Sequence, residues 1–252
     1  MGPVALVTGA SSGIGRAMAI ELASRRHDLV LTARRAGLLE QLADELRAGQ
    51  RMNVEVLPAD LRDRDDLRRV VDRAGSVDVL VANAGFATRG AFADLPPDLE
   101  VGQVELNVLS TLALCRAAAP QMCRRGRGRI LITSSAASFQ PLPGLATYGA
   151  SKAFLTSFAQ ALDSELRPAG VTVTCLAPGF TITEHSTRSP RPAMLWRDAE
   201  QVARAGIDGL FAGRRLVVPG AAWRVVAALA PRLPAAFTLR VARVVGTRMV
   251  GR

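Results

Sequence analysis

The chain contains one tyrosine and one lysine, and they lie four positions apart, at Tyr148 and Lys152. On a helix, residues i and i+4 lie on the same face, with their Cβ atoms roughly 5–6 Å apart. An ammonium group at that distance favours the phenolate, which makes the phenol a better proton donor and acceptor near neutral pH. The spacing therefore predicts acid–base chemistry at this pair.

A glycine-rich turn near the N-terminus is the second candidate for chemistry. The segment Thr8-Gly9-Ala10-Ser11-Ser12-Gly13-Ile14-Gly15 lies between the first expected strand and the first expected helix. Glycines there permit a tight turn and let the backbone approach a pyrophosphate, while the helix N-terminus offers free N–H groups. A merely structural turn is the alternative, but this position along the chain favours a dinucleotide site.

The end of the second expected strand indicates which dinucleotide binds. An acidic residue at that position would bind the ribose 2′-hydroxyl of NAD, whereas this chain reads Leu31-Thr32-Ala33-Arg34-Arg35. Two guanidinium groups suit a 2′-phosphate, so we expect NADP(H) to be preferred over NAD(H). The alternative is that Arg34 and Arg35 only reflect a chain whose 32 basic residues include a single lysine.

The amino-acid composition argues against several other classes of protein. The formal net charge is +10, but no zinc pattern, helix-turn-helix spacing or aromatic-interleaved basic stripe accompanies it, so we expect no nucleic-acid partner. The three cysteines lack metal spacing, so we expect reduced thiols and no metal site. No apolar stretch is long enough to span a membrane, and no charged segment typical of a signal peptide is seen, so we expect a cytoplasmic protein.

Short apolar segments alternate with longer amphipathic ones along the chain. The expected strands are 4–8, 29–33, 54–57, 77–82, 129–134, 171–177 and 216–218, and the expected helices include 14–25, 37–48, 63–74, 99–119 and 148–166. Such alternation is typical of a parallel sheet covered by helices on both faces. We predict a single α/β, doubly wound (Rossmann-type) domain over residues 1–219, with a parallel seven-stranded sheet.

Two regions interrupt this pattern. Residues 180–197, here called the lid, are polar and contain prolines, and loops of that length in compact domains are often functional. Residues 220–252 follow the last strand and predict a C-terminal helical extension, broken near Pro231 and Pro234, with Phe237 and Val241 on one side and Arg240 on another. The extension packs on the domain, contacts a second subunit, or lies on an anionic membrane surface.

Taken together, the motifs resemble the short-chain dehydrogenase/reductase family. The matching residues cover positions 4 to about 183 in the family's order: the glycine turn, Asn83-Ala84-Gly85, Asn107, Ser134-Ser135, Tyr148-x-x-x-Lys152 and Pro178-Gly179. The resemblance implies that Tyr148 is the general acid or base and that Lys152 lowers its pKa and binds the nicotinamide ribose. It also implies that Ser135 holds the substrate carbonyl oxygen and that Asn107 anchors a water on the proton path.

The resemblance implies further cofactor contacts as well. Asp60 and Leu61 would lie near the adenine, Asn83, Ala84 and Gly85 would form the cofactor floor, and Pro178, Gly179, Thr181 and Thr183 would approach the carboxamide or the phosphates. Several residues keep a structural alternative: Asn107 as a helix kink, Asn83 as an amide that ties strands, Ser135 as a cap at the strand end, and Asp60 as a helix N-cap. We expect Asp163 and Glu165, on the same helix as Tyr148, to be solvated.

These expectations converge on an NADP(H)-dependent enzyme that interconverts a carbonyl and an alcohol. Apolar residues between Ser135 and Tyr148, and others in the lid, favour an apolar or lipid-like ketone or aldehyde: Phe139, Leu142, Leu145, Phe180, Met194 and Trp196. The family resemblance implies a homodimer or homotetramer. The alternatives are a non-catalytic NADP-binding sensor or scaffold, and a membrane-associated lipid ketone reductase that contacts the membrane through its C-terminal extension.

Overall fold

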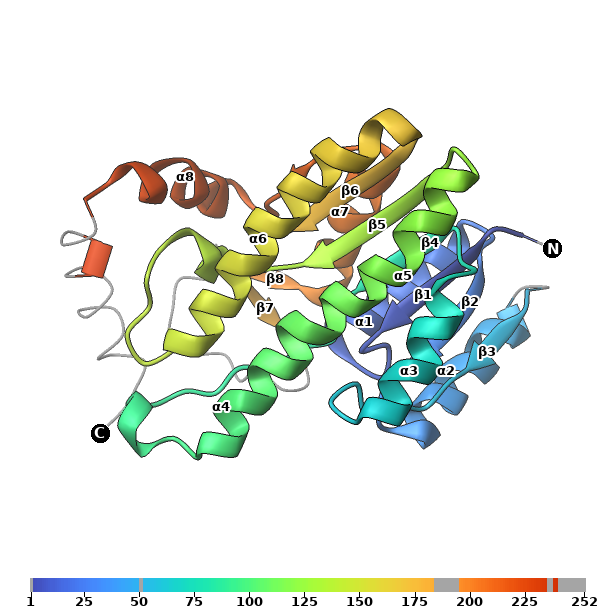
Figure 1. Ribbon diagram of the computed structural model, residues 1–252, viewed down its shortest axis with the longest axis horizontal. Helices are drawn as coiled ribbons and strands as arrows, with labels where there is room; N and C mark the ends of the chain where they lie inside the picture. The colour runs from blue at the N-terminus through green and yellow to red at the C-terminus, as the bar shows by residue number, and fades with distance from the viewer. Residues whose placement is uncertain (1, 50–51, 184–194, 235–237, 240–252) are drawn as a thin grey trace.

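The computed structural model describes residues 2–49, 52–183, 195–234 and 238–239 (Figure 1). Its main sheet has seven parallel strands in the order β3-β2-β1-β4-β5-β6-β9. The strands are β1 (Val4–Thr8), β2 (Asp28–Thr32), β3 (Val54–Val56), β4 (Val79–Ala82), β5 (Gly128–Thr133), β6 (Val171–Leu176) and β9 (Leu216–Val217). The predicted doubly wound sheet is therefore confirmed, with ends that differ from the predicted ones by at most two residues.

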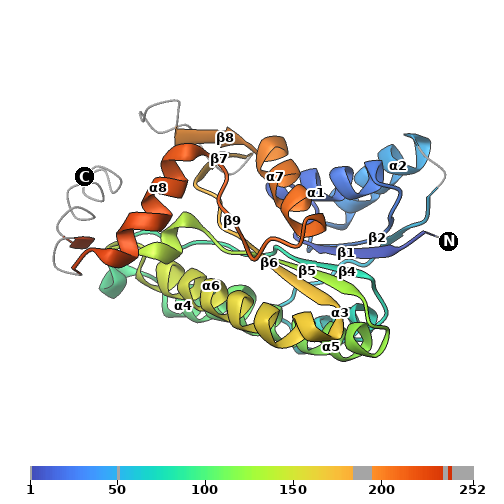
Figure 2. The same ribbon diagram turned by 90° about the horizontal axis from the view of Figure 1, so that it is seen from above.

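Helices cover both faces of the sheet (Figure 2). One face carries α1 (Gly13–Ser24), α2 (Ala36–Gly49) and α7 (Ala199–Phe211), and the other carries α3 (Arg64–Ala74), α5 (Ser110–Arg124) and α6 (Ala146–Leu166). Each face has its own apolar core, because the central strands are buried on both sides. Helix α7, which packs against α1, was not predicted.

The helix expected over 99–119 consists of three pieces. Helix α4 (Pro97–Val104) is followed by a π-helical turn (Glu105–Leu109) and then by α5. Proline at the first position of α4 explains the earlier start, since its ring is compatible with a helix N-terminus. Single π-turns within helices occur frequently at functional sites, and this one contains Asn107.

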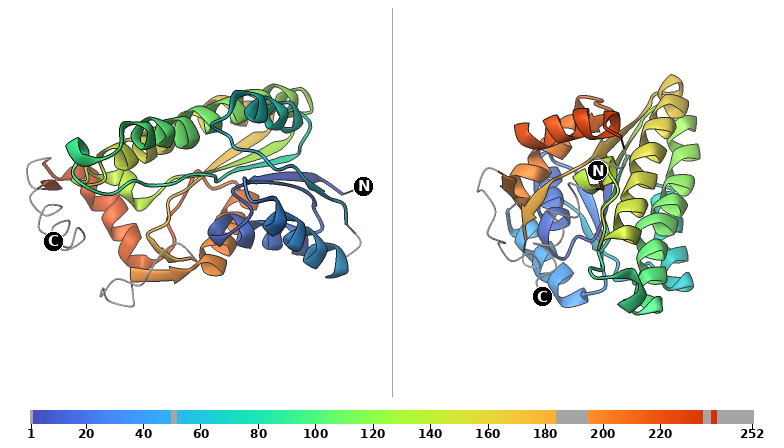
Figure 3. Two further views of the ribbon diagram at one scale, coloured as in Figure 1. Left: turned by 90° about the horizontal axis from the view of Figure 1, so that it is seen from below. Right: turned by 90° about the vertical axis from the view of Figure 1, so that its left-hand side faces the viewer.

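The lid is not wholly irregular. Strands β7 (Phe180–Ile182) and β8 (Trp196–Asp198) pair in parallel outside the main sheet, which corrects the expectation of a loop throughout. Residues 184–194, including Met194, lie outside the described part of the chain. Figure 3 shows β7 and β8 at the same end of the molecule as α8 (Ala221–Leu229).

A turn of 3-10 helix (Ala230–Arg232) ends α8, at the predicted proline break. The residues used to predict a second amphipathic helix, among them Phe237, Arg240 and Val241, lie outside the described residues. Within the residues that the structure describes, no helix combines the length and the apolar character needed to cross a membrane.

The strand order shows where a ligand can bind. The chain leaves β1 for β2 on one side and later returns to β4 on the other, so the order reverses beside β1. In open parallel sheets, ligands bind outside the carboxyl ends of the strands at such a reversal. Gly9, Asn83, Ser134 and Ala177 each directly follow a strand at this edge.

Candidate active site

Tyr148 and Lys152 lie on the first turns of α6, as their spacing predicts. The Lys152 Nζ atom is 5.7 Å from the centroid of the Tyr148 ring, and it donates a hydrogen bond to the Thr133 carbonyl at 2.9 Å. The lysine is only 4% exposed. Burial lowers the pKa of Lys152 to about 8, because the charged form loses solvation.

The phenol of Tyr148 is influenced more by burial than by the lysine. Burial raises the pKa of Tyr148, and a hydrogen bond with the Ser135 side chain partly offsets that rise. The lowering of this pKa expected from Lys152 is therefore not found in the protein alone. Ser135 is the neighbour whose contact lowers the pKa of Tyr148 and so favours the phenolate.

The two adjacent serines have different surroundings. Ser134 is 2% exposed, and its hydroxyl contacts the Lys152 carbonyl at 2.8 Å and the Thr156 hydroxyl at 2.6 Å. The Ser135 hydroxyl accepts the Ala137 N–H at 3.1 Å and so caps a short 3-10 helix. Ser135 thus has both a capping role and a contact with Tyr148, whereas Ser134 is a structural residue.

Asn107 lies in the π-turn and faces the same place. Its Oδ1 accepts the Phe86 N–H at 3.1 Å, and its Nδ2 donates to the Phe86 carbonyl at 3.0 Å and to the Ser151 hydroxyl at 3.1 Å. A Cβ atom at Gly85 would lie 2.8 Å from Asn107 Oδ1 and 3.5 Å from Lys152 Nζ. Asn107 and Lys152 therefore flank Gly85, and a side chain at position 85 would collide with the amide.

The glycine turn has the backbone that the sequence predicts. Gly9 and Gly13 have φ values of +68° and +54°, a region that favours glycine. A Cβ atom at Gly15 would lie 2.2 Å from the Gly9 carbonyl oxygen and 2.6 Å from Asn83 Nδ2. Asn83 Nδ2 also donates to the Thr8 carbonyl at 3.1 Å, so this amide ties β1 to β4, as its structural alternative proposed.

The start of α1 is suited to an anion. Ser12 at the N-cap makes no side-chain capping bond, and the first turn contains no acidic residue. Arg35 donates to the Ser11 hydroxyl at 3.0 Å and to the Ser12 hydroxyl at 2.6 Å. Thr183 lies across the turn, since a Cβ atom at Gly13 would be 3.1 Å from its methyl group. A cation, helix N–H groups and two hydroxyls therefore gather at one glycine turn.

Asp60 has a partner that was not foreseen. Its carboxylate accepts two bonds from the Arg62 guanidinium, at 3.1 and 2.7 Å, and Arg62 lowers the pKa of Asp60. The cap of α3 is Asp63, whose side chain accepts from Asp65 and Asp66 N–H groups, so the N-cap alternative for Asp60 was wrong. Leu61 is 5% exposed and belongs to an apolar core.

An aromatic cluster joins the lid to α8. Phe180 lies 5.3 Å from Trp196 and 5.0 Å from Trp223 between ring centroids. Trp223 Nε1 donates to the Leu195 carbonyl at 3.0 Å, and a Cβ atom at Gly179 would lie 2.0 Å from the same nitrogen. The indole of α8 therefore lies directly on Gly179, and the preceding Pro178 accepts the Ala136 N–H at 2.8 Å.

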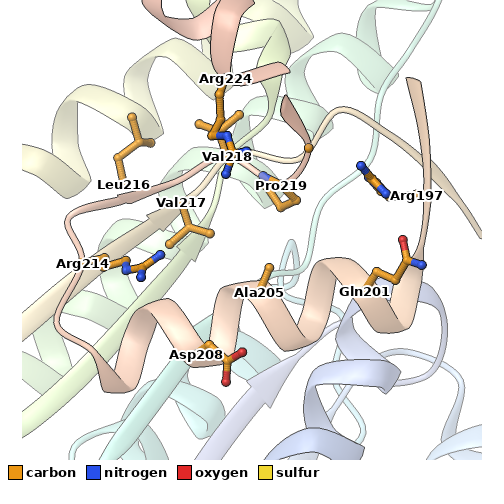
Figure 4. A pocket seen from close by; sticks show the side chains of 11 residues that line it. Arg197, Gln201, Ala205, Asp208, Arg214, Leu216, Val217, Val218, Pro219 and Arg224 are labelled. Carbon is orange, nitrogen blue, oxygen red and sulfur yellow. The ribbon is translucent and has the colours of Figure 1, made fainter. Parts of the chain in front are cut away.

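A hollow of about 540 Å³ lies between α7, β9 and the start of α8 (Figure 4). Three arginines line it, Arg197, Arg214 and Arg224, together with Gln201 and Asp208. None of the residues predicted for chemistry or cofactor binding lines this hollow. The candidate active site therefore lies at the glycine turn and the start of α6, away from this hollow.

Two buried carboxylates differ from the expectations drawn from the sequence: Glu100 was not singled out, and Asp163 was expected to be solvated. Glu100 accepts hydrogen bonds from the Thr88 and Thr147 hydroxyls. Asp163, expected to be solvated, is fully buried and accepts from Arg167, Arg215 and the Val173 N–H; Glu165 is exposed, as expected. Except for Arg167, which lies four residues after Asp163, the partners are ten or more positions away, so no local pattern predicts these contacts.

The hydrogen-bond donors at the glycine turn fit a phosphate-bearing dinucleotide. Gly9, Gly13 and Gly15 keep this turn tight, because a Cβ atom at each would press on a neighbouring atom, and the helix N–H groups with Arg35 complement negative charge. Tyr148, Ser135, Lys152 and Asn107 lie at the same edge of the sheet; the first and third can exchange a proton, and the other two can donate or accept hydrogen bonds. Among the described residues, no three His, Cys, Asp or Glu side chains form a cluster suited to a metal ion.

Comparisons with known proteins agree with this geometry. A family model described as short chain dehydrogenase matches residues 3–192. An uncharacterized oxidoreductase of Myxococcus xanthus is 39% identical over 210 residues, which cover 81% of this chain and 83% of that protein.

Two solved structures resemble nearly the whole chain. A short-chain dehydrogenase from Sphingobium yanoikuyae in complex with NADPH is 30% identical, with a TM-score of 0.82 over 99% of this chain and 96% of the other. A bulky-bulky ketone specific alcohol dehydrogenase from Comamonas testosteroni is 29% identical, with a TM-score of 0.80 over 99% and 95% of the two chains.

Proposed function

Because this chain belongs to the short-chain dehydrogenase/reductase family, an oxidoreductase family that acts on CH–OH groups with NAD(P), we propose that it interconverts an apolar ketone or aldehyde and its alcohol with NADP(H). The observation that carries the proposal is the position of Tyr148: its ring lies beside Lys152, and the Ser135 side chain is near enough to its phenol to lower the pKa of Tyr148. A protein that only bound the cofactor would not need this set.

NADP(H), when bound, supplies or accepts the hydride. The protein's own residues manage the proton and the orientation of the substrate. Tyr148 donates its hydroxyl proton to the carbonyl oxygen during reduction and takes it back during oxidation. Ser135 orients that oxygen by hydrogen bonding. Lys152 supplies the proton to Tyr148, and Asn107, on the other side of Gly85, anchors the water from which Lys152 is reprotonated.

The preference for NADP(H) over NAD(H) is supported by Arg35. Its guanidinium lies at the glycine turn, bonded to Ser11 and Ser12, and no carboxylate follows β2 to bind a 2′-hydroxyl. Arg34 supplies a second exposed cation on the same segment and acts electrostatically on Asp60. A 2′-phosphate would replace the hydroxyl partners of Arg35 with a charged one, which strengthens the bond.

An apolar substrate is supported by the side chains around the site. Trp223 of the aromatic cluster lies next to Gly179 and contacts Phe180, which also contacts Trp196, and Leu142 lies near Gly149 of α6. The name of the relative from Comamonas describes bulky ketones, which supports a ketone as the substrate. We assign residues 1–219 to the catalytic domain and 220–252 to an extension, whose helix α8 covers the end of the lid.

We also propose a homo-oligomer. Apolar side chains on α5, α6 and the π-turn remain exposed, among them Leu109, Leu112 and Phe154. Light scattering after gel filtration tests this directly. The alternative location is a membrane surface. If the reductase binds membranes through its C-terminal extension, the fraction that floats with liposomes should be larger for the full chain than for a chain ending before Pro231.

The function is tested by NADPH oxidation with medium-chain and cyclic ketones and aldehydes, for the wild type and Tyr148→Phe. We expect turnover with bulky apolar ketones, and a loss of at least about a hundredfold in the variant, with NADPH binding retained. NADPH binding without turnover on any carbonyl would instead favour the sensor or scaffold.

A further inference from the structure

A buried carboxylate links the helix of Tyr148 to the loop that follows β4. Glu100 lies on α4 and is 8% exposed. One of its oxygens accepts the hydroxyl hydrogen of Thr88, and the other accepts that of Thr147. Thr147 directly precedes Tyr148, and Thr88 lies three residues after Gly85. Glu100 therefore joins the two segments that flank the proposed reaction site.

Two further hydrogen bonds hold the loop that contains Thr88 in place. Gln103, one turn after Glu100, is completely buried, and its Oε1 accepts the Thr88 N–H at 2.8 Å. The Gly90 N–H donates to the Gly144 carbonyl at 3.1 Å, next to the start of α6. The loop is therefore bonded both to α4, through Gln103, and to the segment before α6, through Gly144. A shift of α6 relative to α4 would strain or break these hydrogen bonds.

The first turn of α6 depends on Glu100 more strongly than the loop does, because it has no side-chain cap of its own. Leu145, at the N-cap of α6, provides no side-chain hydrogen bond to the helix. A carboxylate in a buried site must keep its donors, since an unpaired charge there is costly. Rotation or fraying of the first turn of α6 would remove the Thr147 hydroxyl from Glu100, so the carboxylate resists both motions. The same turn carries the Tyr148 ring towards Ser135.

We propose that Glu100 is a positioning residue that holds Tyr148 against Ser135 by anchoring Thr147. Its effect on turnover rests on the proposed function. Its effect on the phenol does not, because Tyr148 is the only tyrosine in the chain and its ionisation can be followed by ultraviolet absorbance without any substrate.

The test compares Thr147→Val with Thr147→Ser in the full-length protein. Valine keeps the volume of the side chain and removes the donor, whereas serine keeps the hydroxyl. For Thr147→Val we expect the pKa of Tyr148 to rise by roughly half to one unit, because its bond with Ser135 weakens. We expect kcat to fall about tenfold and the Kd for NADPH to stay within about twofold. Thr147→Ser should restore the titration and kcat of the wild type.

The outcomes separate this inference from the proposed function. An absence of turnover in every protein would refute the carbonyl chemistry, while the tyrosine titration still tests the role of Glu100. A folded Thr147→Val protein with the titration of the wild type would overturn the inference. So would a parallel loss of NADPH binding, which indicates general loosening of the fold. Glu100→Ala provides a second variant, expected to change the titration in the same direction.

Discussion

Lys152 donates its hydrogen bond to the carbonyl of Thr133, the last residue of β5, at 2.9 Å. The ammonium group is therefore held by the end of a strand, and its helix is held against the sheet by the Ser134 hydroxyl as well. This arrangement keeps a positive charge buried at the site before any ligand binds. The consequence is a lysine whose pKa is lowered from 10.5 to about 8.

The buried lysine should make stability depend on pH in a defined direction. Between about pH 8 and 10.5 the unfolded chain binds the Lys152 proton more tightly than the folded one, so this residue's contribution to stability increases as pH rises. Relative to Lys152→Met, the wild type should gain up to about 3 kcal/mol across that window. Urea unfolding of both proteins at pH 7.5 and pH 10 measures the difference, which a solvated Lys152 would leave constant.

Replacing Arg35 should change cofactor preference. For Arg35→Ala we expect kcat/KM with NADPH to fall by about 10- to 100-fold and kcat/KM with NADH to change little, because a charge-assisted contact to the 2′-phosphate is lost. Arg127→Ala is the control, since Arg127 is exposed and precedes β5 at the opposite edge of the sheet. Equal losses with both cofactors would mean that Arg35 only supports the glycine turn.

The close packing of Gly15 should not tolerate a methyl group. In Gly15→Ala the new Cβ atom would collide with the Gly9 carbonyl and with Asn83 Nδ2, so we expect a loss of about 1–3 kcal/mol in stability and much weaker NADPH binding. Gly37→Ala, near the start of α2, places its Cβ atom in open space and should be neutral or slightly stabilising. Thermal unfolding and a fluorescence titration with NADPH check both. A variant that matches Gly37→Ala would contradict the packing shown here.

The buried Asp163 should contribute to stability and not to chemistry. Asp163→Asn removes a charge that accepts from Arg167, Arg215 and the Val173 N–H. Because both arginines are partly exposed, water compensates in part, and we expect a cost of about 1–3 kcal/mol. Glu165→Gln, two residues further on the same helix, should cost almost nothing. The measurement is denaturant unfolding, with kcat of the folded variants expected to match the wild type.

The sequence by itself determined the sheet, most of its helices and the candidate site motifs. Apolar strands and helical periodicity are local patterns that persist in any surroundings, and Gly9 and Gly13 occupy backbone conformations that few other residues tolerate. The four-residue spacing of Tyr148 and Lys152 needs only a helix to bring the side chains together. These features required no knowledge of distant contacts.

Only the tertiary structure decided the rest. Glu100 meets Thr147 across 47 positions and Asp163 meets Arg215 across 52, and no local pattern records such contacts. The π-turn at Asn107 and the pairing of β7 with β8 likewise depend on what packs against them. The direction of the pKa of Tyr148 follows from burial, which exists only once the chain has folded. The spacing in the sequence thus brings the reactive groups together, but their pKa values depend on burial and on the partners that the fold provides.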